Sequence, residues 1–143
     1  SIAWMLSVSV ALAACTQKPD NPSKVVDEFI RAMYFEYNYD VVMKLSNDEM
    51  RENIGDMIKR NGKESMSANT AKYNSFEYKI RGERIDDFRQ ILDGHTVDAE
   101  AIVNVYFKGV MDGSGIDGTK GFRLQHKDGN WIIIAGRGVP PFE

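Results

Sequence analysis

The chain of 143 residues has one cysteine, no excess of positive charge and no apolar run long enough to cross a bilayer. A single cysteine, Cys15, excludes an intramolecular disulfide and a metal site built from several cysteines. The net charge of −3 argues against a polybasic surface, so we expect no nucleic-acid partner. The uncharged, largely apolar run over residues 2–15 falls short of the roughly 20 apolar residues of a membrane-spanning helix.

The first fifteen residues also lack charge, because all 18 Lys and Arg and all 21 Asp and Glu lie between Lys18 and Glu143. A short apolar run is typical of the core of a secretory signal. The polar segment 16–22 holds two prolines and is typical of a tether. A signal begins with Met and a positive charge, whereas this chain begins at Ser1, so we expect the start of the signal to precede the given residues.

The apolar run ends in one branched apolar residue, two small residues and the cysteine: Leu12, Ala13, Ala14 and Cys15. Small side chains let an extended backbone enter a peptidase groove, and a thiol is the nucleophile that thioether formation needs. The motif resembles the lipobox of bacterial lipoproteins, in which the cysteine receives a diacylglycerol and the chain is cut before it. The alternative is an ordinary cleaved signal followed by a buried core cysteine.

This resemblance implies a signal peptide over residues 1–14, a lipidated Cys15 and a tether over residues 15–21. Several acyl chains on one residue would anchor the protein stably, because each buried methylene contributes about 0.8 kcal/mol. The membrane is therefore an expected partner. Thr16, rather than an aspartate, follows the cysteine. In lipoproteins of this kind that implies the bacterial cell envelope, at the outer membrane and facing the periplasm.

Helical spacing follows the tether. Asn21-Pro22-Ser23 predicts a helix start, after which apolar residues recur every three or four positions up to Tyr37. They are Val25, Val26, Phe29, Ile30, Met33, Tyr34 and Tyr37. This stripe predicts a helix of about fifteen residues that is interrupted at residues 38–40.

Two shorter helical segments are expected next. Residues 41–45 predict a short helix, and Ser46 with Glu49 matches a capping box, with Ser46 as the cap of a third helix. Gly62 is typical of a helix stop, and the small polar residues 65–70 predict a loop.

Alternation of apolar and polar residues marks the second half of the chain. It predicts strands around residues 76–81, 97–108, 122–127 and 130–135, with a glycine-rich flexible connection over residues 109–121 and a two-residue hairpin turn at Asp128-Gly129. Helices followed by antiparallel strands predict an α+β fold, in which N-terminal helices pack on a curved antiparallel sheet. We expect residues 22–143 to form one domain.

Three features carry a second resemblance: the opening helix from Pro22, the Tyr39-Asp40 break before a short helix, and the last hairpin around Asp128-Gly129. Over about residues 22–136 the chain resembles small bacterial lipoproteins of the nuclear transport factor 2-like superfamily, also called cystatin-like. The resemblance implies a cone of helices and sheet that often encloses an apolar pocket. It also implies three kinds of partner: a small apolar ligand, an envelope protein, and a second copy in a homodimer.

Two hypotheses for function follow. The first is a non-enzymatic binding or assembly domain in the cell envelope. The second is an isomerase- or dehydratase-like enzyme with a histidine and a carboxylate in the pocket, and His126 is its candidate base because it shares a strand face with Phe122 and Leu124. His95 lies in a predicted turn, where a solvated imidazole is expected.

No cofactor or metal is expected. The two histidines are separated by thirty residues and lack a paired ligand spacing. Residues 112–118 superficially resemble a calcium loop, but Ile116 occupies a ligand position and no closing glutamate follows. Asp86 and Asp87 are adjacent, and on a strand they would point to opposite faces rather than share a proton.

Overall fold

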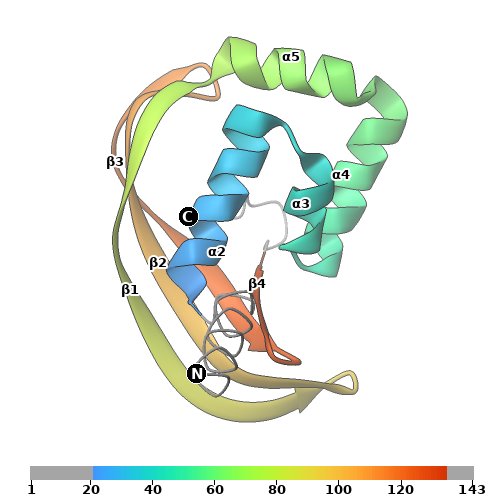
Figure 1. Cartoon of the computed structure of the whole chain (residues 1–143), viewed down its shortest axis with the longest axis vertical. Helices are drawn as coiled ribbons and strands as arrows, with labels where there is room; N and C mark the ends of the chain where they lie inside the picture. Colours follow the sequence, from blue (N-terminus) through green and yellow to red (C-terminus); the bar gives the residue numbers. More distant parts are fainter. Residues whose placement is uncertain (1–20, 135–143) are drawn as a thin grey trace, which may run out of the picture.

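A computed structural model describes residues 21–134 (Figure 1). The expected signal peptide, its motif Leu12, Ala13 and Ala14, and the expected lipidation site Cys15 lie outside the described residues. The described part is an α+β fold in which helices come first and an antiparallel sheet follows. The helices are α2 (Pro22–Ile30), the π-helix η1 (Arg31–Glu36), α3 (Tyr39–Lys44), α4 (Asp48–Asn61) and α5 (Lys63–Tyr73). The strands are β1 (Ser75–Leu92), β2 (His95–Met111), β3 (Ser114–Lys127) and β4 (Asn130–Ile133).

The four strands form one sheet in the order β1-β2-β3-β4, and each strand pairs antiparallel with the next. Asp93-Gly94, Asp112-Gly113 and Asp128-Gly129 make the three connecting turns. In each turn the aspartate has φ between 49° and 51° and the glycine has φ between 79° and 82°. Two successive residues with positive φ are what a type I′ turn requires, and such turns match the right-handed twist of a hairpin.

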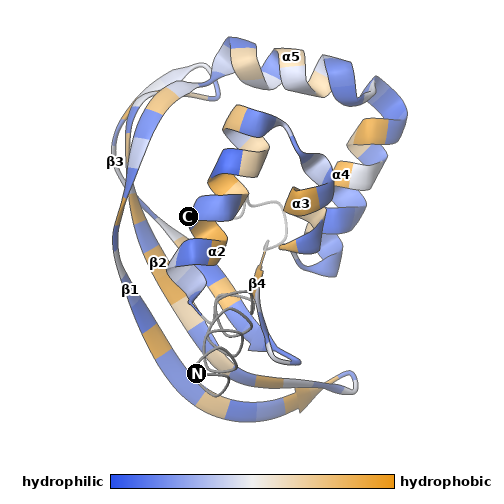
Figure 2. Cartoon of the chain, in the orientation of Figure 1, coloured by the Kyte–Doolittle hydropathy of each residue, from blue (hydrophilic) through white to orange (hydrophobic). Residues whose placement is uncertain are grey.

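The core lies between α2 and the concave face of the sheet, which curves around the helix in Figure 1. Alternate residues of β2 are buried on this face: Val97, Ala99, Ala101, Val103, Val105 and Phe107. Hydrophobic and hydrophilic residues alternate along β1 and β2 in Figure 2. Phe29 of α2 meets Phe122 of β3 edge to face, with 6.1 Å between the ring centroids. Burial of each such side chain contributes about 1.5 to 3 kcal/mol.

Two polar contacts hold α2 against the edge strand β1. The hydroxyl of Tyr78 donates a hydrogen bond to Asp27 Oδ1 at 2.6 Å, and Ser23 Oγ, one turn earlier, bonds to the carboxylate of Glu83. Burial, reinforced by the bond to Asp27, raises the pKa of the Tyr78 hydroxyl. These contacts fix the start of α2 at the level of Glu83 along β1.

The predicted first helix is right in position, but its second half is a π-helix. Asn21 caps α2, and its side chain accepts a bond from Ser23 N at 2.8 Å. The helix continues without a break into η1 and ends at Tyr37, whose φ of 53° is left-handed. Asn38 then caps α3, which confirms the interruption at this residue, but Tyr39 and Asp40, predicted to belong to the interruption, are the first two residues of α3.

The cap of α4 was predicted wrongly. Asn47, not Ser46, is the cap, because its side chain accepts a bond from Met50 N at 3.1 Å. The hydroxyl of the buried Ser46 instead donates to the carbonyl of Val42 at 2.6 Å.

Two predicted loops are regular structure. Residues 65–70 lie inside α5, and the glycine-rich residues 109–121 are mostly strand, with β2 and β3 joined directly at Asp112-Gly113. Met66 is the buried residue of α5, so this helix has no apolar stripe for sequence reasoning to detect. No helix within residues 21–134 is long and apolar enough to cross a membrane.

Candidate functional site

Within residues 21–134, the helices leave one end of the concave face uncovered (Figure 1). This end, which we call the hairpin end, carries the turns Asp93-Gly94 and Asp128-Gly129. Ile85 faces the same side of the sheet as its buried partner Ala101, yet 43% of it is exposed. Apolar surface on the core side of the sheet is therefore open to solvent here.

One row of side chains crosses all four strands at the hairpin end. Asp87 pairs with Ala99, Ala99 with His126, and His126 with Trp131. Directly opposite residues of antiparallel strands share a face, so this row lies on the concave side. Together with Ile85 and Asp98 it lines an open hollow of about 300 Å³, which we call the concave hollow. This volume is at the lower limit of small-molecule sites.

His126 is held in place by two neighbours. Its Nδ1 lies 2.5 Å from Asp98 Oδ1, and its ring centroid lies 4.9 Å from that of Trp131. Only 17% of the His126 side chain is exposed. The alternation-based placement of His126 on the face of Phe122 and Leu124 is confirmed, whereas its catalytic role stays a prediction.

A β-bulge brings Asp98 to His126. The register of β2 and β3 shifts between Val97 and Ala99, which leaves Asp98 without a partner in the strand ladder. An extra residue of this kind re-aims a side chain. Simple alternation places Asp98 on the opposite face from Ala99, so sequence reasoning missed this carboxylate, and the bulge itself has no obvious sequence signal.

The contact with Asp98 selects one tautomer of the imidazole. An ionised carboxylate only accepts hydrogen bonds, so the proton of neutral His126 belongs on Nδ1 and Nε2 keeps its lone pair. Such an imidazole accepts a hydrogen bond or a proton at Nε2. The concave hollow therefore offers two carboxylates and a proton-accepting nitrogen beside apolar side chains.

His95 forms a similar pair outside the lining of the hollow. Its Nδ1 lies 2.6 Å from Asp128 Oδ2, and the backbone amide of Thr96 donates to Asp128 Oδ1 at 3.1 Å. The hydrogen bond from His95, together with that from Thr96, lowers the pKa of Asp128. About half of the His95 side chain is exposed, as a turn position predicts, but the imidazole contacts a carboxylate as well as solvent.

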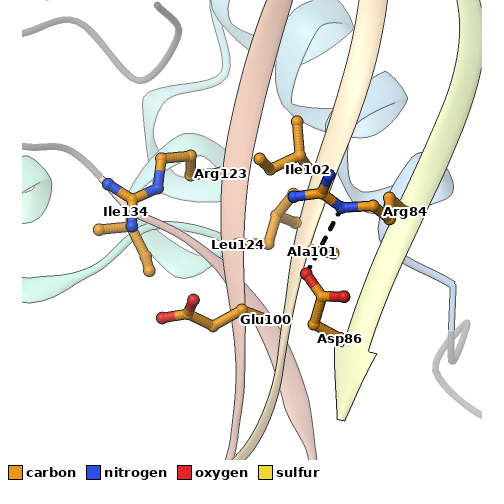
Figure 3. A pocket seen from close by; sticks show the side chains of 8 residues that line it. All are labelled: Arg84, Asp86, Glu100, Ala101, Ile102, Arg123, Leu124 and Ile134. Carbon is orange, nitrogen blue, oxygen red and sulfur yellow. Dashed lines mark ion pairs between the residues drawn. The ribbon is translucent and has the colours of Figure 1, made fainter.

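The convex face carries a smaller hollow (Figure 3). Arg84, Ile102 and Arg123 are partners across three strands, and Asp86 pairs with Glu100 in a neighbouring row. Figure 3 shows Arg84 and Asp86 facing each other, with Arg84 Nε 3.4 Å from Asp86 Oδ2, while Arg123 lies on the other side with Ile134. The volume of about 80 Å³ is too small for most organic ligands.

The adjacent aspartates point apart, as predicted. Asp86 lines the convex hollow of Figure 3 and Asp87 lines the concave hollow. A shared acid–base pair between them is therefore excluded.

A further hollow, of about 360 Å³ on the convex face, is lined in part by side chains that already contact one another. The Arg81 guanidinium lies 4.9 Å from the ring centroid of Tyr106, and the Tyr106 hydroxyl bonds to Asp117. That bond to Asp117 raises the pKa of Tyr106. The aromatic ring and the cation are thus already engaged with each other.

Within residues 21–134, no group of three or more His, Cys, Asp or Glu side chains could hold a metal ion. The segment that resembles a calcium loop, residues 112–118, is instead a tight turn followed by the start of β3. Comparisons of the chain with models of known families, with curated proteins and with solved structures found no match.

Proposed function

We propose that this chain is a lipid-anchored protein of the bacterial cell envelope, and that its domain binds a small amphipathic ligand in the concave hollow. The observation that carries the binding function is the row Asp87, Ala99, His126 and Trp131, which lines an open hollow beside the exposed Ile85. The order of helices and sheet supports the finer proposal of a nuclear transport factor 2-like cone.

The anchor rests on sequence. The Leu12-Ala13-Ala14-Cys15 motif and the polar segment after it support cleavage before Cys15 and acylation of its thiol. Thr16 supports the outer membrane, facing the periplasm, as the location.

The lining of the hollow indicates the ligand class. Asp87 and Asp98 favour a cationic or hydrogen-bond-donating group, and Ile85 and Trp131 favour an adjoining apolar group. A short alkyl amine has both parts. An alkyl carboxylate of the same length has the same apolar part but the wrong charge, so it is the matched control ligand.

The anchor is tested by labelling cells with a palmitate analogue. We expect label on the wild-type chain and none on Cys15→Ala, because the thiol is the acceptor. Equal labelling of both would remove the anchor from the account.

The ligand site is tested by tryptophan fluorescence. Of the two tryptophans, Trp4 lies in the proposed signal peptide, so Trp131 is the one tryptophan of residues 15–143, and it lines the hollow. We expect hexylamine to change the Trp131 emission with a Kd at least tenfold lower than that of hexanoate.

Two neighbouring variants sharpen the fluorescence test. Asp87→Asn removes a carboxylate from the hollow and should weaken hexylamine binding severalfold. Asp86→Asn removes one from the opposite face and should leave binding unchanged. Equal effects of the two variants would place the ligand elsewhere.

The enzyme hypothesis is the second candidate, because Asp98 lies within hydrogen-bond reach of His126. Nε2 could then accept a proton from a carbon acid. Its other requirement, a closed cavity, is not met by residues 21–134, which leave the hollow open. Incubation with cyclohexanone in D2O separates the two functions. Deuterium incorporation that His126→Gln abolishes supports the enzyme, and exchange at the buffer rate supports the binding function.

A further inference from the structure

Exposed apolar side chains gather where β1 approaches its turn. Ile91 is 72% exposed and Leu92 is 40% exposed, and both directly precede the Asp93-Gly94 turn. Ile85, on the same strand, adds the exposed surface at the mouth of the concave hollow. Single exposed apolar residues are ordinary. Ile91 and Leu92 are successive strand residues and point to opposite faces of the hairpin tip, so a surface covers both only if the tip itself is inserted into it.

The chain enters the described fold near this end of the sheet. Asn21 caps α2, and the bond between Ser23 and Glu83 sets that helix start against β1. Residues 84–92 continue past Glu83, and a strand of this length extends up to about 30 Å. In Figure 1 the start of α2 and the β1–β2 hairpin lie toward the same end of the molecule.

The proposed tether and this stretch of strand have similar maximum lengths. Residues 15–21 number seven and span at most about 24 Å when fully extended. If acyl chains on Cys15 are in the bilayer, Asn21 lies within that distance of its surface. The tip of the hairpin can then reach the membrane surface when the hairpin end faces the membrane, because the tether holds Asn21 within about the length of residues 84–92.

The charge of the hairpin end selects the kind of lipid surface. Its turns and strand ends carry more carboxylates than cations: Asp86, Asp87, Asp93, Asp98, Glu100 and Asp128 against Arg84, Arg89 and Lys127. An anionic lipid surface would repel this excess. Zwitterionic headgroups such as phosphatidylcholine instead present an outward ammonium group that complements carboxylates.

We propose that the hairpin end is a second membrane contact, which sets Ile91 and Leu92 into the interface of a zwitterionic lipid surface. The proposal rests on the lipid anchor at Cys15. It turns the mouth of the concave hollow toward the membrane, so that an amphipathic ligand enters from the lipid side.

The test uses the acylated full-length mature chain in phosphatidylcholine vesicles. Acylation consumes the sulfur of Cys15, so a cysteine introduced by Ile91→Cys is the only thiol and takes a polarity-sensitive fluorophore. Val110→Cys is the matched control, because Val110 is an apolar residue that is 39% exposed at the opposite end of the sheet. We expect a blue shift and quenching by spin-labelled lipid at position 91, and neither at position 110.

The outcomes separate this inference from the anchor. Flotation of the protein with vesicles while both probes report water overturns the hairpin contact and keeps the anchor. Failure to float at all overturns the anchor and the inference that rests on it. A further arm adds phosphatidylglycerol at low salt: we expect severalfold weaker quenching at position 91, and stronger quenching would contradict the assignment to a zwitterionic surface.

Discussion

At the scale of single residues, backbone geometry places strict demands on a few positions. Gly109 has φ of 136°, and a Cβ at this position would lie 2.3 Å from the carbonyl oxygen of Ser75 and 2.8 Å from Phe76 Cα. Both contacts are with the backbone of β1, which is paired with Gly109 and cannot turn aside as a side chain could. Gly109 therefore lets the start of β1 and the end of β2 lie close together.

Gly109→Ala should therefore destabilise the fold by about 2 to 4 kcal/mol, from the clash and from the unfavourable φ together. Urea unfolding followed by circular dichroism measures the change. Gly118→Ala is the control, because a Cβ there has nothing within 4 Å. Similar losses in the two variants would show that the close approach at Gly109 is not what matters.

The stability that Asp128 gives to the β3–β4 turn depends on pH. Its pKa is lowered in the folded state by the bonds from His95 and Thr96, so its contribution to stability is complete above the ordinary aspartate value of about 3.9. This contribution to stability is lost as the pH falls through the lowered pKa of Asp128. Asparagine also tolerates the left-handed conformation of this turn position, where φ is 49°.

We expect Asp128→Asn to lower the Tm at pH 7 and to lower it progressively less below pH 4, until wild type and variant converge. Thermal unfolding from pH 7 to pH 2 measures the difference. A difference in Tm that stays constant over this range would contradict the assignment of the effect to the charge of Asp128.

At the scale of elements, the start of a helix depends on which of two neighbouring polar residues acts as its cap. Ser46 and Asn47 are both good cap residues by type, and the sequence favours Ser46 through its spacing to Glu49. Ser46 is instead drawn into the core, where its hydroxyl bonds to Val42 and its backbone bridges to Ile133 of β4. Tertiary contacts of Ser46 thus shift the start of α4 by one residue.

Asn47→Ala should cost about 1 kcal/mol of unfolding free energy, because Met50 N loses its partner. Glu49→Ala should cost no more than about 0.5 kcal/mol, since it loses only the favourable charge near the helix start. Chemical denaturation of the two variants measures both losses in unfolding free energy. A larger loss in Glu49→Ala would restore the capping box that the sequence predicts.

Elements with strong periodicity were predictable, and those without it were not. The alternation in β2 predicts its buried face, and Asp128-Gly129 predicts its hairpin. Helix α5 buries mainly Met66, so it leaves no stripe in the sequence, and the glycines of β3 hide a strand that is paired along its length with β2. At the site, the same alternation predicts the face of His126. It misses Asp98, because a bulge is a property of two paired strands rather than of one.

At the scale of the whole molecule, the helices cover one end of the concave face and leave the other open. The open end brings together the concave hollow, both histidine–aspartate pairs and the exposed tip of the β1–β2 hairpin. The proposed tether enters near the same end, at the start of α2. Ligand binding and membrane contact are therefore proposed for one end of the molecule.

The most direct test of this account is an amide and indole NMR titration of the ¹⁵N-labelled protein with hexylamine. We expect shifts that saturate at Asp87, Asp98, His126 and the Trp131 indole, because these line the concave hollow. Arg84 and Arg123, which line the hollow on the convex face, should not move. Shifts confined to the convex face, or no saturable shift at the concave hollow, would contradict the proposed ligand site.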